Sequence, residues 1–395
     1  MISPILKTAV IFGAGNIGRG FIAQLFTQSG YKVIFIDVNR SLVDKINQDQ
    51  SYPIEIVSNK GNYEIKINPV HAVHGLDQEG IALAICSADI LATAVGVHAL
   101  PGIAGPLAAG LHRRWQNNQL TSLNIIICEN LLHANHVLKE LVRTKLDLHE
   151  HVLLDQSIGF VEASIGRMVP AATKIALSEN LLRIITEAFD ELPVDREGFV
   201  GEIPEIKNMI AVSPFGFFIQ RKLYIHNMGH AITAYLGYLT GYQYIWESIR
   251  DLEIHRIVSS AMLEAAQALA KEHGVGLDII RVYLDDLLDR FDNIQLGDTV
   301  MRVGRDVKRK LAPQDRLIGA LNLCVKHHLK CENICTGIAA AFLFQEPDLL
   351  FVPSSHTESE VEQVMSGYCE LEKGSEEWNS IKKHYRQLIN RYSSN

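Results

Sequence analysis

The chain has 395 residues, of which 47% are apolar and 21% charged, and its formal net charge is −8. This length predicts two domains, and this composition is typical of a globular enzyme and excludes a disordered chain. The acidic balance argues against nucleic acid as the main partner, and no apolar run reaches the ~18 residues of a membrane span.

The start of the chain and its cysteines predict its compartment. No charged and then apolar leader precedes the first predicted strand at residues 9–12, which indicates a cytoplasmic protein. The six scattered cysteines form no disulfide framework, as expected in a reducing compartment. The expected partner is a small molecule, with neither nucleic acid nor membrane, and the sequence is compatible with a monomer or a homodimer.

A glycine turn between two predicted strands dominates the first half. The apolar run at 9–12 leads into Gly-Ala-Gly-Asn-Ile-Gly at 13–18, then into helical spacing of apolar residues over 17–25. A second strand at 32–36 ends in Asp37. This order of strand, glycine turn, helix, strand and acid predicts dinucleotide binding. The alternative is a glycine turn that only helps packing.

Each position of the turn has a physical role. Gly13 permits the tight turn, Gly15 lets the backbone approach a pyrophosphate, and Gly18 lets the helix pack on the strand. Asp37 can accept hydrogen bonds from the ribose hydroxyls and would repel a 2′-phosphate, which favours NAD over NADP. NADP remains an alternative cofactor, because Arg40 lies nearby and an arginine can bind the 2′-phosphate.

Further apolar runs predict an α/β fold, with a doubly wound, Rossmann-type sheet. They lie at 81–85, 90–95 and 123–128, and the second would deliver small residues beside the cofactor. The predicted cofactor-binding residues are Gly13, Ala14, Gly15, Asn16, Ile17, Gly18, Asp37, Thr93 and Val95.

Asn130 follows the predicted strand at 123–128. Ligands in such folds bind beyond the carboxyl ends of the strands, which would place Asn130 close to a nicotinamide ring. The alternative is a helix N-cap before Leu131.

From about residue 205 the pattern becomes helical. Gly201 and Pro204 interrupt it, so the predicted domains are a dinucleotide-binding domain at 1–200 and a mostly α-helical substrate-binding domain at 201–395. Helical periodicity is clearest at 254–272, 277–290, 317–328 and 334–343.

A lysine, an asparagine and a histidine lie within nine residues of this half. Lys222, Asn227 and His230 would fall within an arc of about 140° on an α-helix, so one face can present all three. Such a face is often solvated surface, but the neighbouring residues are apolar. Apolar surroundings, together with Arg221 and His226, would depress the pKa of the lysine, as a general base requires.

A basic cluster packs five cations into residues 302–310. Arg302, Arg305, Arg309 and Lys310 are candidate ligands for a substrate phosphate, although such runs are often solvated faces.

Two histidines and two cysteines lie close together at 327–335. His327, His328, Cys331 and Cys335 lack zinc-site spacing, so the cysteines are interpreted as buried helical residues, and no metal is predicted.

These features together resemble the mannitol dehydrogenase family of long-chain, polyol-specific dehydrogenases, over nearly the whole chain. The resemblance rests on residues 12–21, 128–130, 227–237, 302–305 and 309–311.

The resemblance implies a zinc-independent dehydrogenase. Lys222 would be the catalytic lysine, Asn130 and Asn227 would hold the reacting oxygen, and His230 would orient the substrate. The first and last cations of the run at 302–310 would contact the far end of the polyol.

Three positions depart from the family pattern. Gly166 stands where the family carries an aspartate at the substrate, with Glu162 as the possible replacement. Gln220 replaces an acid two residues before the lysine, and Val307 replaces a proline.

The expected function is therefore NAD-dependent interconversion of D-mannitol 1-phosphate and D-fructose 6-phosphate. Two alternatives remain. One is a family member that reduces hexuronates such as fructuronate or tagaturonate, and the other is an NAD-binding sensor without turnover.

Overall fold

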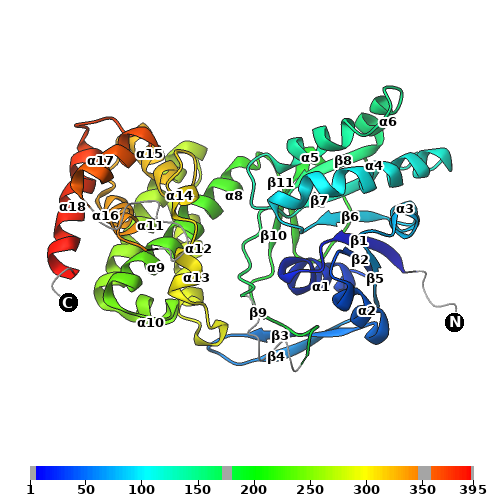
Figure 1. Cartoon of the computed structure of the whole chain (residues 1–395), viewed down its shortest axis with the longest axis horizontal. Helices are drawn as coiled ribbons and strands as arrows, with labels where there is room; N and C mark the ends of the chain where they lie inside the picture. Colours follow the sequence, from blue (N-terminus) through cyan, green and yellow to red (C-terminus); the bar gives the residue numbers. More distant parts are fainter. Residues whose placement is uncertain (1–5, 171–179, 346–356, 393–395) are drawn as a thin grey trace. The chain divides into compact units, whose positions relative to one another are not determined.

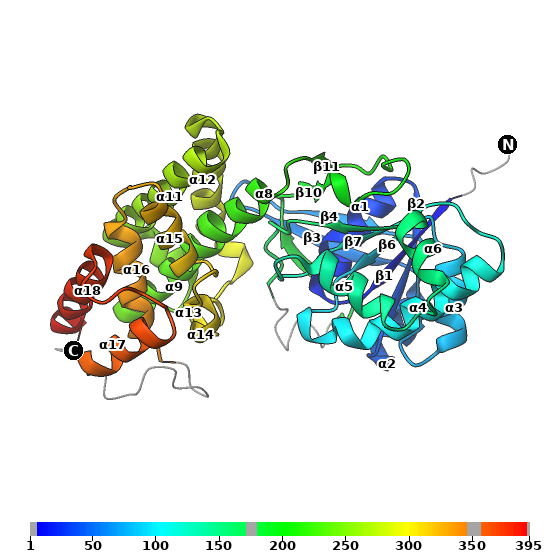
Figure 2. The ribbon, with the colours of Figure 1, turned by 90° about the horizontal axis from the view of Figure 1, so that it is seen from above.

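The computed structural model describes residues 6–170, 180–345 and 357–392. The chain forms two compact units, Met1–Phe215 and Gly216–Asn395, and Figures 1 and 2 label their elements. All six cysteines have free thiols. Within the described ranges, no helix is long and apolar enough to cross a membrane.

A six-stranded parallel sheet forms the centre of the first unit, in the strand order β5-β2-β1-β6-β7-β8. Because β1 lies between β2 and β6, the winding direction changes beside β1, where doubly wound sheets bind their ligands. The strands are β1 (Lys7–Phe12), β2 (Tyr31–Asp37), β5 (Val70–His74), β6 (Ile90–Thr93), β7 (Leu123–Ile127) and β8 (Ile158–Glu162).

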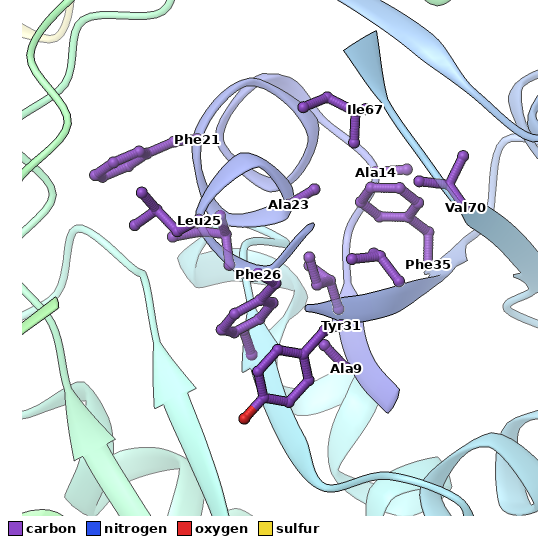
Figure 3. Close-up of a cluster of buried hydrophobic side chains, with 14 of the residues drawn as sticks. Ala9, Ala14, Phe21, Ala23, Leu25, Phe26, Tyr31, Phe35, Ile67 and Val70 are labelled. Atoms are coloured by element: carbon purple, nitrogen blue, oxygen red, sulfur yellow. The ribbon is translucent and has the colours of Figure 1, made fainter. Parts of the chain in front are cut away.

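Both faces of this sheet are buried. In β1, Ala9 and Ile11 join one hydrophobic core, and Val10 and Phe12 join the other, because successive side chains point to opposite faces. Figure 3 shows part of the first core, in which Phe21 and other side chains after the glycine turn gather beside β1 and β2. Among the described residues of this unit, the α-helices are α1 (Ala23–Gln28), preceded by a π-helical turn at Gly18–Ile22, α2 (Arg40–Asp49), α3 (Gln78–Cys86), α4 (Leu100–Gln116), α5 (Ala134–Arg143) and α6 (Glu150–Ser157).

The strand predicted at 81–85 is wrong, because these residues lie in α3. Asp77 caps this helix by accepting a hydrogen bond from Gly80 N at 3.0 Å. Ile81 and Ile85 are buried on one side, with Ala84 beside them. A short apolar run looks alike in a buried helix and a buried strand, and here the cap decides between them.

Two smaller sheets complete the first unit. One has the order β4-β3-β9, with β3 at Tyr52–Val57, β4 at Tyr63–Ile67 and β9 at Ile184–Glu187. The other pairs β10 (Leu192–Asp195) in parallel with β11 (Met209–Val212). Because β11 pairs with β10, the unit continues to Phe215, beyond the predicted boundary at residue 200.

The second unit is helical in its described residues, and α9 (Met228–Thr240) lies at its centre. This helix packs on α10, α11, α13 and α16, and two of its glycines allow close approach. A Cβ on Gly229 would lie 2.6 Å from Met262 Sδ, and one on Gly237 would lie 2.0 Å from Ser248 Oγ. The other helices are α8 (Gly216–Arg221), α10 (Ile245–Arg250), α11 (Leu252–His273), α12 (Leu277–Phe291), α13 (Val300–Gly304), α14 (Val307–Lys310), α15 (Ile318–Lys326), α16 (Glu332–Phe342), α17 (Glu358–Gly367) and α18 (Glu376–Tyr392).

Candidate active site

A cavity of about 440 Å³ opens at the carboxyl ends of β1, β2 and β6 in the first unit. Four of the predicted cofactor-binding residues line it: Gly13, Gly15, Asp37 and Val95. The sequence did not indicate several apolar lining residues, which come from the segments after β2, β5 and β6. These are Val38, Leu76, Ala99, Ile103 and Pro106.

The three glycines of the turn have different roles. Gly13 has φ +96°, and a Cβ on it would lie 2.4 Å from Ala94 O. A Cβ on Gly18 would lie 2.0 Å from Gly13 O, so both glycines are needed for packing. Gly15 has no atom within 4 Å of its Cβ position, although it lines the cavity. Packing alone therefore does not explain Gly15, whereas an open approach for a phosphate group does.

The remaining predicted residues are not among those that line the cavity. Ala14 is buried and donates its N–H to Asp37, and Ile17 packs against the first core. Asn16 donates from Nδ2 to Pro170 O at 3.2 Å. Thr93 is fully buried at the end of β6.

Asp37 lies at the rim of the cavity, at the end of β2. Its carboxylate accepts hydrogen bonds from Ala14 N at 2.7 Å and from Asn39 N at 2.8 Å. Arg40 is exposed at the start of α2 and is not among the lining residues of the cavity. Asp37 therefore lies at the cavity, whereas Arg40 lies outside its lining.

Replacing Asp37 with asparagine should raise the KM for NAD about tenfold and lower the KM for NADP. The amide oxygen can still accept from one backbone N–H, so the fold should persist while the negative charge is lost. Initial rates with both cofactors measure the effect, and Asp44→Asn on α2 is the control. An unchanged ratio of the two KM values would contradict this role for Asp37.

Asn130 is exposed just beyond β7, at the carboxyl edge of the sheet. Helix α5 begins only at Ala134, with His133 as its N-cap residue, so the alternative N-cap role of Asn130 is wrong. The preceding residue, Glu129, is buried, and its carboxylate accepts hydrogen bonds at 2.9 Å from Val95 N and Gly96 N. No sequence pattern indicated a role for this acid, which fixes the turn after β6 that lines the cavity.

Two positions near β8 concern the aspartate that the family carries: Gly166, which stands in its place, and Glu162. A Cβ on Gly166 would lie 3.0 Å from the ring of Phe189, so a larger residue would require that ring to shift. Glu162 is buried, and it accepts hydrogen bonds from the backbone of His133 and Ala134. Burial raises the pKa of Glu162. Glu162 thus contacts the start of α5, and its proposed replacement of the missing aspartate stays a prediction.

In the second unit, Lys222 and Asn227 begin and end a π-helical turn, Lys222–Asn227, that joins α8 to α9. A π-helix pairs residue i with residue i+5, so the two side chains lie one turn apart on one face. An α-helix would separate them by about 140°. Such turns are rare and often occur at functional sites.

The amine of Lys222 is desolvated and lies among other charges. Burial, followed by the cation of Arg316, lowers its pKa to about 7, with Arg309 adding to this effect and Asp315 opposing it. Arg221 and His226, which were predicted to lower this pKa, are not among its causes. Arg221 stacks on the ring of Tyr283 at 4.0 Å instead. A lysine with a pKa near neutral can exchange protons in both directions at physiological pH.

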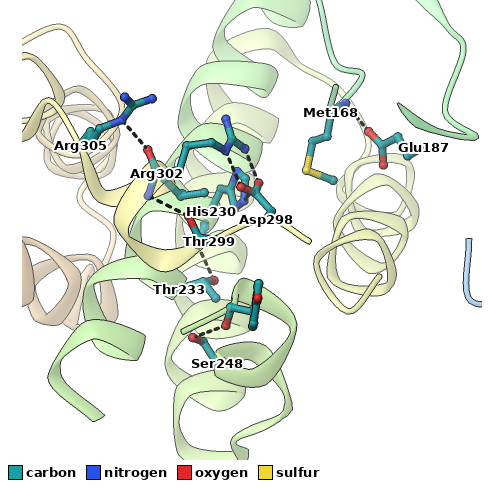
Figure 4. Close-up of polar contacts among 12 residues, drawn as sticks. Met168, Glu187, His230, Thr233, Ser248, Asp298, Thr299, Arg302 and Arg305 are labelled. Carbon is teal, nitrogen blue, oxygen red and sulfur yellow. Dashed lines mark hydrogen bonds and ion pairs between the residues drawn. The ribbon is translucent and has the colours of Figure 1, made fainter. Parts of the chain in front are cut away.

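His230 lies in α9, about one helical turn after Asn227, and two contacts hold its ring in place. Its Nε2 atom lies 3.3 Å from Oδ2 of Asp298, and its ring stacks on Phe291 with centroids 4.9 Å apart. Arg302 donates to the same carboxylate, from Nε at 2.6 Å and also from Nη2 (Figure 4).

The predicted basic cluster has both buried and exposed members. Arg305 and Arg309 are exposed, and Arg309 pairs with Asp306 and, at 3.2 Å, with Asp315. Lys310 is buried, and its Nζ donates to Val303 O. Burial, followed by neighbouring arginines, lowers the pKa of Lys310 to about 7.

Two further sequence observations have structural counterparts. Gln220, which replaces the family's acid, lies 2.9 Å from His273 Nε2 through its Oε1 atom. Cys331 and Cys335 are buried at the start of α16, and His327 pairs with Glu272 at 2.7 Å.

Family models match both units. The model described as mannitol dehydrogenase Rossmann domain matches residues 7–208, and the one described as mannitol dehydrogenase C-terminal domain matches residues 215–391.

Two curated relatives carry the same name. The mannitol-1-phosphate 5-dehydrogenase of Thermoanaerobacter pseudethanolicus is 37% identical over 384 residues, which are 96% of this chain and 97% of that protein. The enzyme of the same name from Oceanobacillus iheyensis is 38% identical, over 87% of this chain and 88% of its own.

Solved structures share the fold. Mannitol 2-dehydrogenase of Pseudomonas fluorescens, in a ternary complex with NAD and D-mannitol, aligns with a TM-score of 0.77 at 15% identity, over 100% of this chain and 94% of that one. A D-sorbitol dehydrogenase aligns with a TM-score of 0.80 at 15% identity, over 98% of this chain and 93% of that one.

Proposed function

The chain belongs to the mannitol dehydrogenase family, and we propose that it interconverts D-mannitol 1-phosphate and D-fructose 6-phosphate, using NAD and Lys222. The family and the names of both curated relatives support this reaction. The observation that carries the acid–base assignment is the desolvated Lys222, whose pKa of about 7 is set by burial and by Arg316, on a π-helical turn with Asn227.

The chain's side chains have these roles in the proposed reaction. A nicotinamide cofactor bound in the cavity of the first unit would supply the hydride chemistry of both directions. In oxidation, the neutral amine of Lys222 takes the hydroxyl proton, and in reduction its ammonium group gives that proton back to the oxygen. The amides of Asn227 and Asn130 donate hydrogen bonds to the oxygen as negative charge develops on it. His230 orients the substrate.

The cofactor assignment rests on the cavity in the first unit. Gly15 leaves room for the pyrophosphate, and Asp37 presents a carboxylate to the ribose diol. The second of these features favours NAD over NADP.

The phosphate of the substrate is assigned to the basic cluster. Residues 302–316 contain six cations and two carboxylates, which leaves an excess of positive charge for a dianion. The proposed ligands are Arg302, Arg305, Arg309 and Lys310.

The substrate is tested by initial rates of NADH consumption with four compounds: fructose 6-phosphate, fructose, fructuronate and tagaturonate. We expect turnover with fructose 6-phosphate at least 100-fold faster, in kcat/KM, than with fructose. Activity confined to a hexuronate would replace the proposed substrate, since the cations can also bind a carboxylate. NAD binding without turnover on any compound would favour a sensor.

The pH dependence should differ between the two directions. Because the pKa of Lys222 lies at about 7, its amine is protonated below that pH and neutral above it. The kcat/KM for oxidation should therefore rise about tenfold per pH unit below pH 7 and level off above it. Reduction should show the opposite profile, falling above pH 7.

The pKa of Lys310 also lies at about 7, so a variant is needed to show which of the two lysines causes the inflection. In Lys310→Met the inflection should stay near pH 7, because Lys310 is not among the groups that set the pKa of Lys222. Loss of the inflection in this variant would assign it to Lys310 instead.

A further inference from the structure

The buried carboxylate of Asp298 contacts His230 and Arg302, two residues that are proposed to bind the substrate. Asp298 is 6% exposed and lies 3.3 Å from His230 Nε2, while its two oxygens accept from the guanidinium of Arg302 (Figure 4). Burial alone would raise the pKa of Asp298, but His230 and Arg302 outweigh it and hold the pKa below its usual value. The carboxylate is therefore ionised at neutral pH.

The backbone fixes the position of this carboxylate. Asp298 O accepts from Ile245 N at 2.9 Å, and Val300 N donates to Gln243 O at 3.0 Å. Between them, Thr299 caps α13 by accepting from Arg302 N at 3.2 Å. The segment is thus tied on one side to the turn after α9, the helix that carries His230, and on the other to Arg302.

The ring of His230 has little freedom to turn. It stacks on Phe291 at an interplanar angle of 13°, with His226 6.2 Å away between ring centroids. Burial lowers the pKa of His230 despite the opposing effect of Asp298, so the ring is neutral at pH 7. A neutral imidazole carries one N–H, and its other nitrogen is an acceptor.

We propose that Asp298 is a positioning residue that selects the tautomer of His230. The carboxylate draws the proton to Nε2 and leaves Nδ1 to accept a hydrogen bond from a substrate hydroxyl. The same carboxylate also orients Arg302, so it positions both side chains, His230 and Arg302, that are proposed to contact the substrate. This inference rests on the proposed function, and it identifies a residue on which polyol recognition depends.

The tautomer is measured directly, without substrate, by ¹⁵N NMR of histidine-labelled full-length protein. The signal of His230 is assigned by its loss in His230→Gln. The native protein should show Nε2 protonated and Nδ1 unprotonated. A proton on Nδ1 in the native protein would overturn the proposal, whether or not any variant folds.

Variants then test the cause of the tautomer. In Asp298→Asn the amide can either accept or donate, so His230 should show a mixture of tautomers. Asp155→Asn is the matched control, because Asp155 also pairs with an arginine, Arg143, at 2.6 Å, but on the exposed surface of the first unit. An unchanged His230 tautomer in Asp298→Asn would overturn the assignment.

Kinetics provide the second readout. For Asp298→Asn we expect kcat/KM with fructose 6-phosphate to fall on the order of 100-fold, and Asp155→Asn should match the native enzyme. A fall of less than threefold would overturn the role of Asp298. If the native enzyme does not turn over this substrate, the proposed function fails, but the tautomer measurement still decides the role of Asp298.

Discussion

Replacing Lys222 with methionine should lower kcat for fructose 6-phosphate reduction about 10³-fold while leaving NADH binding unchanged. Loss of a general acid–base commonly costs 10²- to 10⁴-fold. Methionine has nearly the length of lysine and no charge, so it suits the buried position that lowers the pKa of the lysine to about 7. The stability of the variant should therefore equal or exceed that of the native protein.

The measurement combines three assays on one preparation. Steady-state rates give kcat, quenching of protein fluorescence gives the Kd for NADH, and thermal unfolding gives the melting temperature. Lys326→Met is the control, because Lys326 is exposed on α15 and pairs with Glu272. Turnover within tenfold of native in Lys222→Met would remove this lysine from the reaction.

Local sequence patterns predicted the nucleotide-binding part of the fold well. The strands β1, β2, β6 and β7 were recognised because buried parallel strands are short apolar runs bounded by turns. The spacing also predicted a glycine that leaves open space, and Gly15 lines the cavity with no atom within 4 Å of its Cβ position. Four helices of the second unit, α11, α12, α15 and α16, were found from their apolar periodicity.

Features that depend on long-range contacts were not predicted. The helix α3 was mistaken for a strand, because a run such as Ile81–Ile85 has too little polarity to reveal its period. The contact between His230 and Asp298 spans a long stretch of chain, and no local pattern announces it. The four-residue spacing of Asp298 and Arg302 was the available signal, since an acid and an arginine at i and i+4 can pair.

The lowered pKa of Lys222 has one cause that the sequence indicated and others that it did not. Sequence indicated an apolar environment around Lys222, and burial is the largest cause of its lowered pKa. The cations that add to this effect, Arg316 and Arg309, come from distant sequence and were not anticipated. The π-helical turn was also beyond prediction, although it puts Asn227 on the face of Lys222.

Replacing Asn227 with aspartate should lower kcat in both directions by about 10²- to 10³-fold, as removal of an oxyanion donor does. Aspartate has the same shape, but it loses the amide N–H donors and places a carboxylate one π-helical turn from Lys222. That negative charge should raise the pKa of Lys222 above its native value of about 7. The inflection in the oxidation profile should therefore move to higher pH.

The pH shift separates this explanation from a simple structural defect. If the carboxylate acts on the lysine, raising the pH should restore part of the oxidation rate in Asn227→Asp by deprotonating Lys222. Reduction should gain nothing, because raising the pH removes the proton that Lys222 must give to the oxygen in that direction. Asn379→Asp is the control, since Asn379 is exposed on α18 and donates to Gly374 O at 3.1 Å. An inflection that stays at pH 7 in Asn227→Asp would mean that residue 227 does not face the amine of Lys222. The proposal that the two residues act together on one face of the π-helical turn would then be wrong.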